Sequence, residues 1–166
     1  MLDDDLIRAA EATLAICRLA GRRLGTAESC TGGLIAAALT AIAGSSDVVG
    51  AGFVTYSNAA KTSLLGVPAG MIERVGAVSE EVARAMAEGA LARLPELGIA
   101  VSVTGIAGPG GGSETKPVGL VHFGLAYRGA ATIADRQVFA GDRTEIRRRA
   151  ALHALDLVRR SAAKPA

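Results

Sequence analysis

The sequence predicts a three-layer α/β/α domain built around a mixed, mainly parallel sheet. Short apolar segments alternate with segments whose apolar residues recur at helical spacing, as in parallel sheets covered by helices on both faces. Two further apolar segments, at 119–127 and 132–139, are joined at Arg128-Gly129, and this short link predicts one antiparallel hairpin. Without an internal repeat or a linker-like stretch, residues 1–166 are expected to form a single domain.

The first half of the chain alternates helices with apolar segments. Its expected elements are, in order, a helix at 3–22, a strand at 24–28, a helix at 34–39, a β-rich segment at 48–56 and a short helix at 58–65. The first helix begins with acids and ends with arginines, and both choices complement the helix dipole. Gly50 and Gly52 interrupt the β-rich segment and indicate a bulge or a close backbone contact. The short helix is expected to end at Gly66, ahead of Pro68.

The second half of the chain contains the helix with the strongest sequence signal. Its expected elements are a helix at 79–94, a strand at 99–104, a glycine-rich loop at 105–113, the hairpin, a final helix at 144–161 and a frayed tail at 162–166. Ser79 is the expected N-cap of the first of these helices, with Glu80 and Glu81 in its acidic first turn. The strand is continuously apolar, which is typical of a strand buried on both faces.

Composition narrows the functional classes. Half of the residues are hydrophobic and only 3% are aromatic, so small aliphatic side chains are expected to fill the core. No apolar run approaches the roughly 20 residues of a membrane span, and the start of the chain is acidic, unlike a signal peptide. Cys17 and Cys30 have no metal-binding or redox spacing, which indicates a reducing, cytoplasmic setting. The net charge of +2 is too small to indicate nucleic acid. We interpret His122 and His153 as structural, and expect no metal and no cofactor.

The segment at 26–34 carries the most functional information, because it places small polar residues where a strand turns into a helix. Ser29 and Cys30 set a hydroxyl beside a thiol. The helix N-terminus presents unpaired N–H groups, and Gly32 and Gly33 allow a ligand to approach that backbone closely. The arrangement fits anion binding or a nucleophile beside an oxyanion hole. The alternative is a simple Ser/Thr N-cap followed by a glycine turn.

Two other segments place polar groups where strands end. Tyr56 and Lys61 lie where the β-rich segment passes into the short helix. A lysine at such a point is either a base with a lowered pKa or simply a solvated side chain. Thr104 and Gly105 open the glycine-rich loop at the carboxyl edge of the sheet, where open α/β sheets bind ligands. The alternative for this segment is a merely flexible loop.

Arginines at the start of the last helix need a separate explanation. Arg143 and Arg147 lie near its amino end, where a cation opposes the helix dipole. Binding a phosphate or a carboxylate there would explain their placement. The other arginines of this helix fit a solvated basic face; they are Arg148, Arg149, Arg159 and Arg160.

Taken together, seven segments resemble the CinA C-terminal domain family, over roughly residues 6–160. They are AESCTGG at 27–33, VTYSN at 54–58, AK at 60–61, LLGV at 64–67, GAVSEEVA at 76–83, TGIAGPGG at 104–111 and KPVG at 116–119. No single segment is decisive, but the set in this order is specific. The characterised activity of the family is nicotinamide-nucleotide amidohydrolase. Longer CinA proteins carry an additional N-terminal domain, so this chain resembles the stand-alone deamidase form.

The resemblance implies hydrolysis of the carboxamide of nicotinamide mononucleotide, a pyridine nucleotide, to nicotinic acid mononucleotide and ammonia, by a homodimeric enzyme. Ser29 is then the expected nucleophile and neutral Lys61 the expected base, as in Ser-Lys variants of the catalytic triad. The remaining expected roles are an oxyanion site at the amides of Cys30, Thr31, Gly32 and Gly33, orientation or proton relay by Tyr56 and Thr104, and a phosphate site formed by Arg143, Arg147 and the loop from Gly105.

Several alternatives stay open at the level of sequence. Cys30 is a rival nucleophile by its chemistry, although the resemblance favours Ser29. An ordered water positioned by Ser29 is an alternative attacking group. The competing functional class is a non-catalytic nucleotide-binding or regulatory module linked to competence or DNA damage. The presence of Ser29, Tyr56 and Lys61 together favours the enzyme, because a binding module would need only the glycines and arginines.

Overall fold

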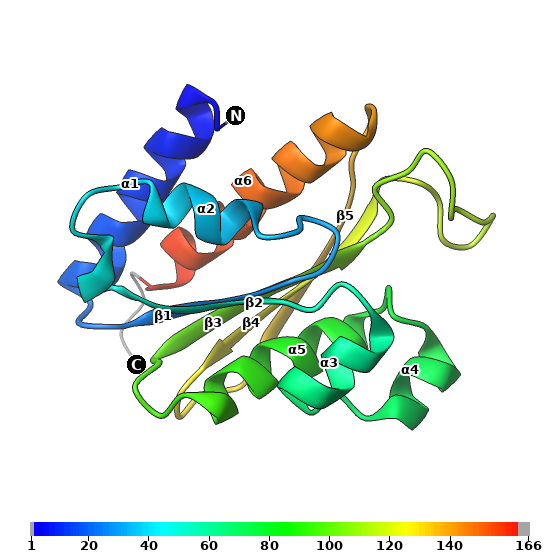
Figure 1. The fold of residues 1–166 in the computed structure, drawn as a ribbon, viewed down its shortest axis with the longest axis horizontal. Helices are drawn as coiled ribbons and strands as arrows, with labels where there is room; N and C mark the ends of the chain where they lie inside the picture. The colour runs from blue at the N-terminus through cyan, green and yellow to red at the C-terminus, as the bar shows by residue number, and fades with distance from the viewer. Residues whose placement is uncertain (1, 163–166) are drawn as a thin grey trace.

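The computed structural model describes residues 2–162, which form a five-stranded sheet between two layers of helices (Figure 1). The elements are α1 (Asp4–Leu19), β1 (Leu24–Glu28), α2 (Leu34–Thr40), the 3-10 turn η1 (Ser45–Asp47), β2 (Val49–Val54), α3 (Asn58–Leu65), α4 (Ala69–Val75), α5 (Glu80–Arg93), β3 (Ile99–Gly105), β4 (Leu120–Tyr127), β5 (Ile133–Val138) and α6 (Arg143–Ala162). The predicted three-layer α/β/α fold is confirmed.

Strand order in the sheet is β2-β1-β3-β4-β5, and the pairing changes direction across it. β2, β1 and β3 run parallel, whereas β4 is antiparallel to both β3 and β5. The predicted hairpin is therefore present, and the β3–β4 pair is a second antiparallel pair that the sequence did not predict. The glycine-rich loop between β3 and β4 contains no helix to cross over the sheet, so β4 returns in the opposite direction.

The parallel strands place three chain segments at one edge of the sheet. Glu28, at the end of β1, lies opposite Val54 of β2 and Val103 of β3 in the register. The segments that follow these three strands therefore leave the sheet side by side. They contain most of the polar residues singled out above, so the fold gathers them at the edge where open α/β sheets bind ligands.

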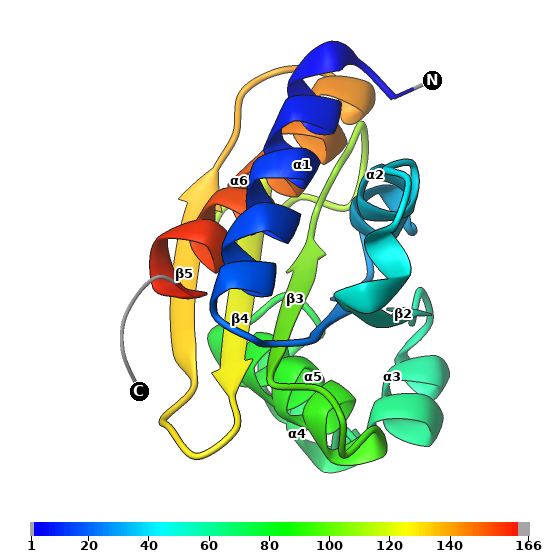
Figure 2. The same ribbon diagram turned by 90° about the vertical axis from the view of Figure 1, so that its left-hand side faces the viewer.

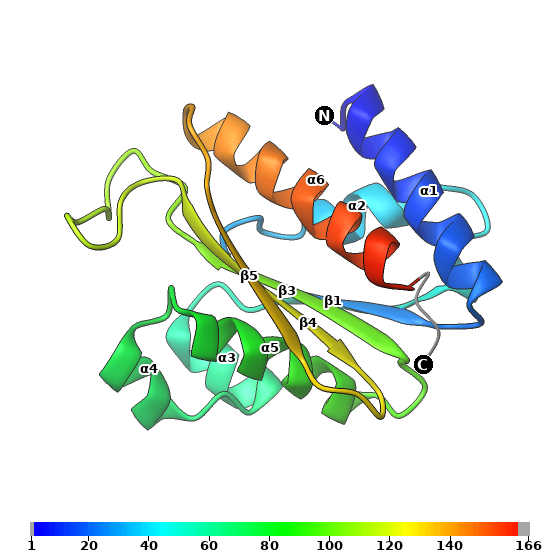
Figure 3. The same cartoon turned by 180° about the vertical axis from the view of Figure 1, so that it is seen from behind.

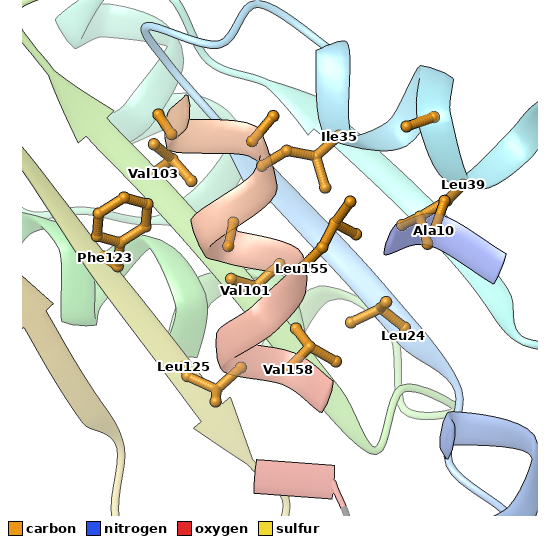
Figure 4. Close-up of a cluster of buried hydrophobic side chains, with 14 of the residues drawn as sticks. Ala10, Leu24, Ile35, Leu39, Val101, Val103, Phe123, Leu125, Leu155 and Val158 are labelled. Carbon is orange, nitrogen blue, oxygen red and sulfur yellow. The ribbon is translucent and has the colours of Figure 1, made fainter. Parts of the chain in front are cut away.

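Helices cover the two faces of the sheet in two groups (Figures 1 and 3). α1, α2 and α6 pack on one face, and α3, α4 and α5 lie on the other. Turned by 90°, the molecule shows α1 and α6 running alongside each other over the strands (Figure 2). On this face Leu155 and Val158 of α6 belong to one buried cluster with Val101 and Leu125 of the sheet (Figure 4). Small aliphatic side chains dominate the core, as composition predicted.

Local sequence signals placed most element boundaries within a few residues. Ser79 caps α5 as expected, because its hydroxyl accepts a hydrogen bond from the amide of Val82 at 3.3 Å. The short helix α3 has the predicted bounds and ends at Gly66, which has a left-handed backbone. α4 was not among the predicted elements; Pro68, expected only to follow the end of the preceding helix, is its N-cap. Of the predicted tail, Ala162 belongs to α6, and residues 163–166 lie outside the described residues. No helix within residues 2–162 is long and apolar enough to cross a membrane.

Candidate active site

A buried serine–lysine pair lies at the carboxyl edge of the sheet. Ser29 follows the last residue of β1, and its amide extends the strand pairing by donating to the carbonyl of Val103 at 2.9 Å. Lys61 lies on α3, which belongs to the helical layer on the other face of the sheet from α2. Its Nζ donates to Oγ of Ser29 at 3.0 Å and to the carbonyl of Thr55 at 2.9 Å. Two segments separated by 32 positions thus meet in one polar contact.

The environment of Lys61 favours its neutral form. The side chain is only 1% exposed, and no carboxylate within the described residues forms an ion pair with it. Burial lowers the pKa of Lys61, and the nearby Cys30 opposes that shift only in part. A buried lysine without a counter-ion releases its proton more readily than a solvated one, and catalytic lysines share this property. The alternative of a solvated lysine is therefore wrong for Lys61.

Cys30, the rival nucleophile, is in an environment that suppresses its reactivity. The thiol is 6% exposed, and burial raises its pKa to about 12. Only the thiolate is a strong nucleophile, so Cys30 stays protonated and inert at neutral pH. The structure therefore favours the hydroxyl of Ser29, which is already hydrogen-bonded to a basic group.

Glu28 closes the amino end of α2. Its carboxylate is fully buried and accepts hydrogen bonds from backbone amides of the following turn and helix, with a weaker contact to a neighbouring hydroxyl. The donors are the amides of Gly33 at 3.0 Å, Ile35 at 3.1 Å and Ala36 at 2.9 Å, and the hydroxyl of Thr26 at 3.3 Å. These bonds satisfy the amides that a helix N-terminus leaves unpaired and complement its dipole. Sequence reasoning did not foresee this cap, because Glu28 lies in the preceding strand.

This cap revises the expected oxyanion site. The amide of Gly33 donates to Glu28 and that of Gly32 donates to the carbonyl of Ser29 at 3.0 Å, so neither is free for a substrate oxygen. The amides of Cys30 and Thr31 donate to no other described residue. Two of the four expected amides therefore remain as candidate donors.

Arg147, from α6, contacts the same turn from the other side. Its Nε donates to the carbonyl of Cys30 at 3.2 Å, and its Nη2 donates to the carbonyl of Thr31 at 2.9 Å. Gly32 permits this approach, because a Cβ at its position would lie 3.3 Å from Nη2 of Arg147 and its φ is +61°. The turn after Ser29 is therefore held by a cation on its carbonyls and by an anion on its amides.

Arg143, at the start of α6, contacts the two segments that follow β2 and β3. Its Nη1 donates to the carbonyl of Gly108 at 2.9 Å, and its Nη2 donates to the hydroxyl of Tyr56 at 2.8 Å. Tyr56 is 60% exposed, so much of its side chain lies at the surface. Within the described residues, neither Arg143 nor Arg147 has a carboxylate partner. Among residues 2–162, these two positive charges are therefore not paired directly with a carboxylate.

Thr104 and the glycine-rich loop border the site. The hydroxyl of Thr104 is buried and donates to the carbonyl of Ala77 at 2.8 Å, so it ties β3 to the segment before α5. Gly105 ends β3, and the amide of Ile106 continues the ladder to Leu120. Within the described residues no cluster of His, Cys, Asp and Glu side chains could hold a metal ion.

Comparisons with known proteins agree with this architecture. Residues 7–162 match the model of the CinA C-terminal domain. A CinA-like protein of Mycolicibacterium vanbaalenii is 57% identical over 143 residues, which cover 86% of this chain and 34% of that protein. A putative competence-damage inducible protein of Symbiobacterium thermophilum is 56% identical over 148 residues, covering 84% of this chain and 34% of that protein. The chain thus spans about a third of the length of these relatives.

Solved structures extend the likeness to nearly the whole chain. The competence/damage inducible protein CihA from Agrobacterium tumefaciens superposes with a TM-score of 0.91 at 46% identity, covering 95% of this chain and 96% of that one. The competence damage-inducible protein A (ComA) from Klebsiella pneumoniae gives 0.90 at 37% identity, covering 95% and 97%. With the family model matching nearly all described residues, the chain belongs to the CinA C-terminal domain family.

Proposed function

We propose that the protein is an amidohydrolase that converts nicotinamide mononucleotide to nicotinic acid mononucleotide and ammonia. The observation that carries the proposal is the 3.0 Å contact between Nζ of Lys61 and Oγ of Ser29, in a buried setting without a carboxylate. Burying a lysine amine without a counter-ion costs free energy in either protonation state, and a module that only binds nucleotides gains nothing from it. The choice of substrate rests on the resemblance of the sequence to nicotinamide-nucleotide amidohydrolases.

The first half of the proposed reaction forms an acyl-enzyme. Neutral Lys61 accepts the proton of the Ser29 hydroxyl while Oγ attacks the carboxamide carbon. The carbonyl oxygen becomes an oxyanion, and the amides of Cys30 and Thr31 are the donors proposed to stabilise it. When the tetrahedral intermediate collapses, the C–N bond breaks and the protonated Lys61 gives its proton to the leaving ammonia.

The second half returns the enzyme to its starting state. Lys61 is neutral again after ammonia leaves, so it can take a proton from the water that attacks the acyl carbon. Collapse of the second intermediate breaks the bond to Oγ, and Lys61 returns the proton to Ser29. The product leaves the intermediate as a carboxylic acid with one oxygen from water, and it releases its proton to the solvent to become the carboxylate. Direct attack by a water that Ser29 positions is the alternative, and it forms no covalent adduct.

The rest of the substrate requires a binding site for its phosphate. Arg143 is the proposed contact, because its charge is not matched by a carboxylate and it lies against Gly108 in the glycine-rich loop. A phosphate at this place would accept charge-assisted hydrogen bonds from the guanidinium. Tyr56 is then proposed to orient the substrate, since its hydroxyl accepts from Arg143. A homodimer and a cytoplasmic location remain proposals that rest on the resemblance and on the cysteine content.

Ammonia release from nicotinamide mononucleotide tests the proposal directly. The wild-type protein is expected to release ammonia and Ser29→Ala to release almost none, while binding of the nucleotide by calorimetry is unchanged. Rapid acid quenching and intact-mass measurement are expected to detect a nicotinoyl-nucleotide adduct on Ser29. Turnover without any adduct would favour direct water attack. Binding without turnover by the wild type would favour the regulatory module instead.

A further inference from the structure

The directions of two backbone amides beside Ser29 follow from what their own peptide groups contact. In a trans peptide the C=O of one residue and the N–H of the next point in opposite directions. The carbonyl of Ser29 accepts from the amide of Gly32, so the N–H of Cys30 points away from that bond. The carbonyl of Cys30 accepts from Nε of Arg147, so the N–H of Thr31 points away from the guanidinium. Both carbonyls accept a hydrogen bond, and the amides of Cys30 and Thr31 donate to no other described residue.

The geometry points to Arg147 as a positioning residue: we propose that it fixes the Cys30–Thr31 peptide so that the Thr31 amide, with that of Cys30, is aimed at the developing oxyanion. This inference rests on the proposed amide hydrolysis at Ser29. Arg147 contacts neither the substrate nor the reacting atoms in this role. It acts through the backbone of the turn, by holding the carbonyl sides of two successive peptides.

The guanidinium of Arg147 is poorly placed to bind the substrate phosphate as well. Arginine binds phosphate most strongly through a fork of two parallel N–H donors. The fork formed by Nε and Nη2 is already directed at the carbonyls of Cys30 and Thr31. Releasing it would leave the Cys30 carbonyl without a donor and the Thr31 carbonyl with only the Leu34 amide, at 3.3 Å, so the Cys30–Thr31 peptide would be free to rotate. The phosphate contact is therefore assigned to Arg143 alone.

The hydrogen bonds of Glu28 cover only the downstream part of the turn, so a second charged side chain, Arg147, is needed for the rest. Its carboxylate secures the amides of Gly33, Ile35 and Ala36, which are the downstream part of the turn and the start of α2. It does not reach the peptides on either side of Cys30. Those peptides are left to the Gly32 amide and to Arg147, so the catalytic end of the turn depends on a side chain 117 positions away.

The test compares Arg147→Met and Arg147→Lys with Arg149→Met, a matched control on the same helix whose side chain pairs with Glu145. Steady-state kinetics use nicotinamide mononucleotide and the riboside that lacks the phosphate. We expect Arg147→Met to lower kcat about 10- to 100-fold for both substrates with little change in KM, because a misaimed oxyanion donor affects the transition state. Arg147→Lys keeps one donor and is expected to be intermediate. An equal kcat, or a rise in KM confined to the phosphorylated substrate, would overturn the inference.

A second readout does not depend on the natural substrate. A small fluorophosphonate reacts with an activated serine: Oγ forms a bond to phosphorus, fluoride leaves and Lys61 takes the hydroxyl proton. Intact-mass measurement is expected to show Ser29 labelled at the wild-type rate in Arg149→Met and about tenfold or more slowly in Arg147→Met. If nicotinamide mononucleotide is not hydrolysed but this difference persists, the proposed function fails and the inference stands. Equal labelling rates, or no labelling of the wild type, would overturn the inference.

Circular dichroism and thermal melting show whether each variant is folded. If Arg147→Met does not fold, Arg147→Lys provides the comparison, because a lysine retains the charge and can reach one of the two carbonyls. Slower labelling by folded Arg147→Lys then supports the inference, and wild-type labelling by it contradicts the inference.

Discussion

The arginines of α6 fall into two groups that differ in what they contact. Arg148, Arg149, Arg159 and Arg160 each form an ion pair with a carboxylate, and most of these pairs are solvent-exposed. Arg143 and Arg147, near the amino end, donate instead to backbone carbonyls and a phenol. Matched surface pairs are screened by water and contribute little to stability. Arg143 and Arg147 have no carboxylate partner, so they leave positive charge at the edge of the sheet. That is the edge where the anionic substrate is proposed to bind and the oxyanion to form.

The same contrast separates Lys61 from an ordinary surface lysine. Lys61 has one hydroxyl and one carbonyl as partners and is almost completely buried. Burial without a counter-ion lowers its pKa, so the side chain can exchange protons where a solvated lysine could not. Under the proposed mechanism, the charged side chains that take part in the chemistry are those without an opposite charge beside them. Variants of matched and unmatched charges test that distinction.

The largest effect is expected from Lys61→Arg. Arginine keeps the positive charge but cannot give up its proton, so ammonia release should fall by roughly three orders of magnitude or more. In the wild type, kcat/KM is expected to rise with pH through an ionisation below the ordinary pKa of lysine, because burial favours the neutral amine. Initial rates between weakly acidic and alkaline pH check both points. Substantial turnover by Lys61→Arg would make Lys61 a fixed charge and overturn its role as the base.

A smaller effect is expected from Arg143→Met, because it removes a binding contact and not a proton transfer. The KM for nicotinamide mononucleotide should rise about 10- to 100-fold, corresponding to a charge-assisted contact of about 1.5–3 kcal/mol. The riboside should show no such rise. Equal losses for the two substrates would show that Arg143 supports the site structurally instead of binding phosphate.

Glu28→Gln tests a buried charge that, unlike that of Lys61, is hydrogen-bonded to several backbone amides. The substitution retains the shape but places an NH₂ group against backbone amides, so unfolding free energy should fall by about 1–3 kcal/mol. Urea unfolding monitored by circular dichroism measures this change. An unchanged unfolding midpoint would mean that the buried carboxylate adds little beyond what a neutral acceptor provides.

The smallest effect is expected from one of the α6 arginines that pair with a carboxylate at the surface. Arg159 pairs with Asp156 at 2.6 Å and its side chain is half exposed, so Arg159→Met should change unfolding free energy by no more than about 0.5 kcal/mol. Its kcat and KM should match the wild type. A clear loss of activity in this variant would remove the distinction between the two groups of arginines.

Sequence reasoning predicted the fold well because its signals are local. The spacing of apolar residues, the Ser79 cap and the glycine at the end of α3 each act within a few residues. The parallel pairing of β1 with both neighbours then brings the candidate segments together, as strand order in such folds requires. The antiparallel β3–β4 pair was missed because the length of a loop does not state which way the next strand runs.

The contacts within the site were less predictable, because they join distant segments or reverse a local expectation. Gly33 was expected to face a ligand, but its amide is taken by Glu28 from the preceding strand. The burial of Lys61 depends on how α3 packs against the sheet, and nothing in its immediate sequence states that. The reach of Arg147 to the carbonyls of Cys30 and Thr31 spans more than a hundred positions and leaves no local pattern.

The turn between β4 and β5 lies at the opposite end of the sheet from Ser29, because β4 starts beside the glycine-rich loop and runs away from it. Gly129 and Ala130 are exposed there, and neither takes part in the site. A cysteine for fluorophore attachment can therefore replace Ala130, whereas Gly129 has a φ of +84° that favours glycine. Protein immobilised through this turn would leave the candidate site, at the other end of the sheet, accessible to ligands.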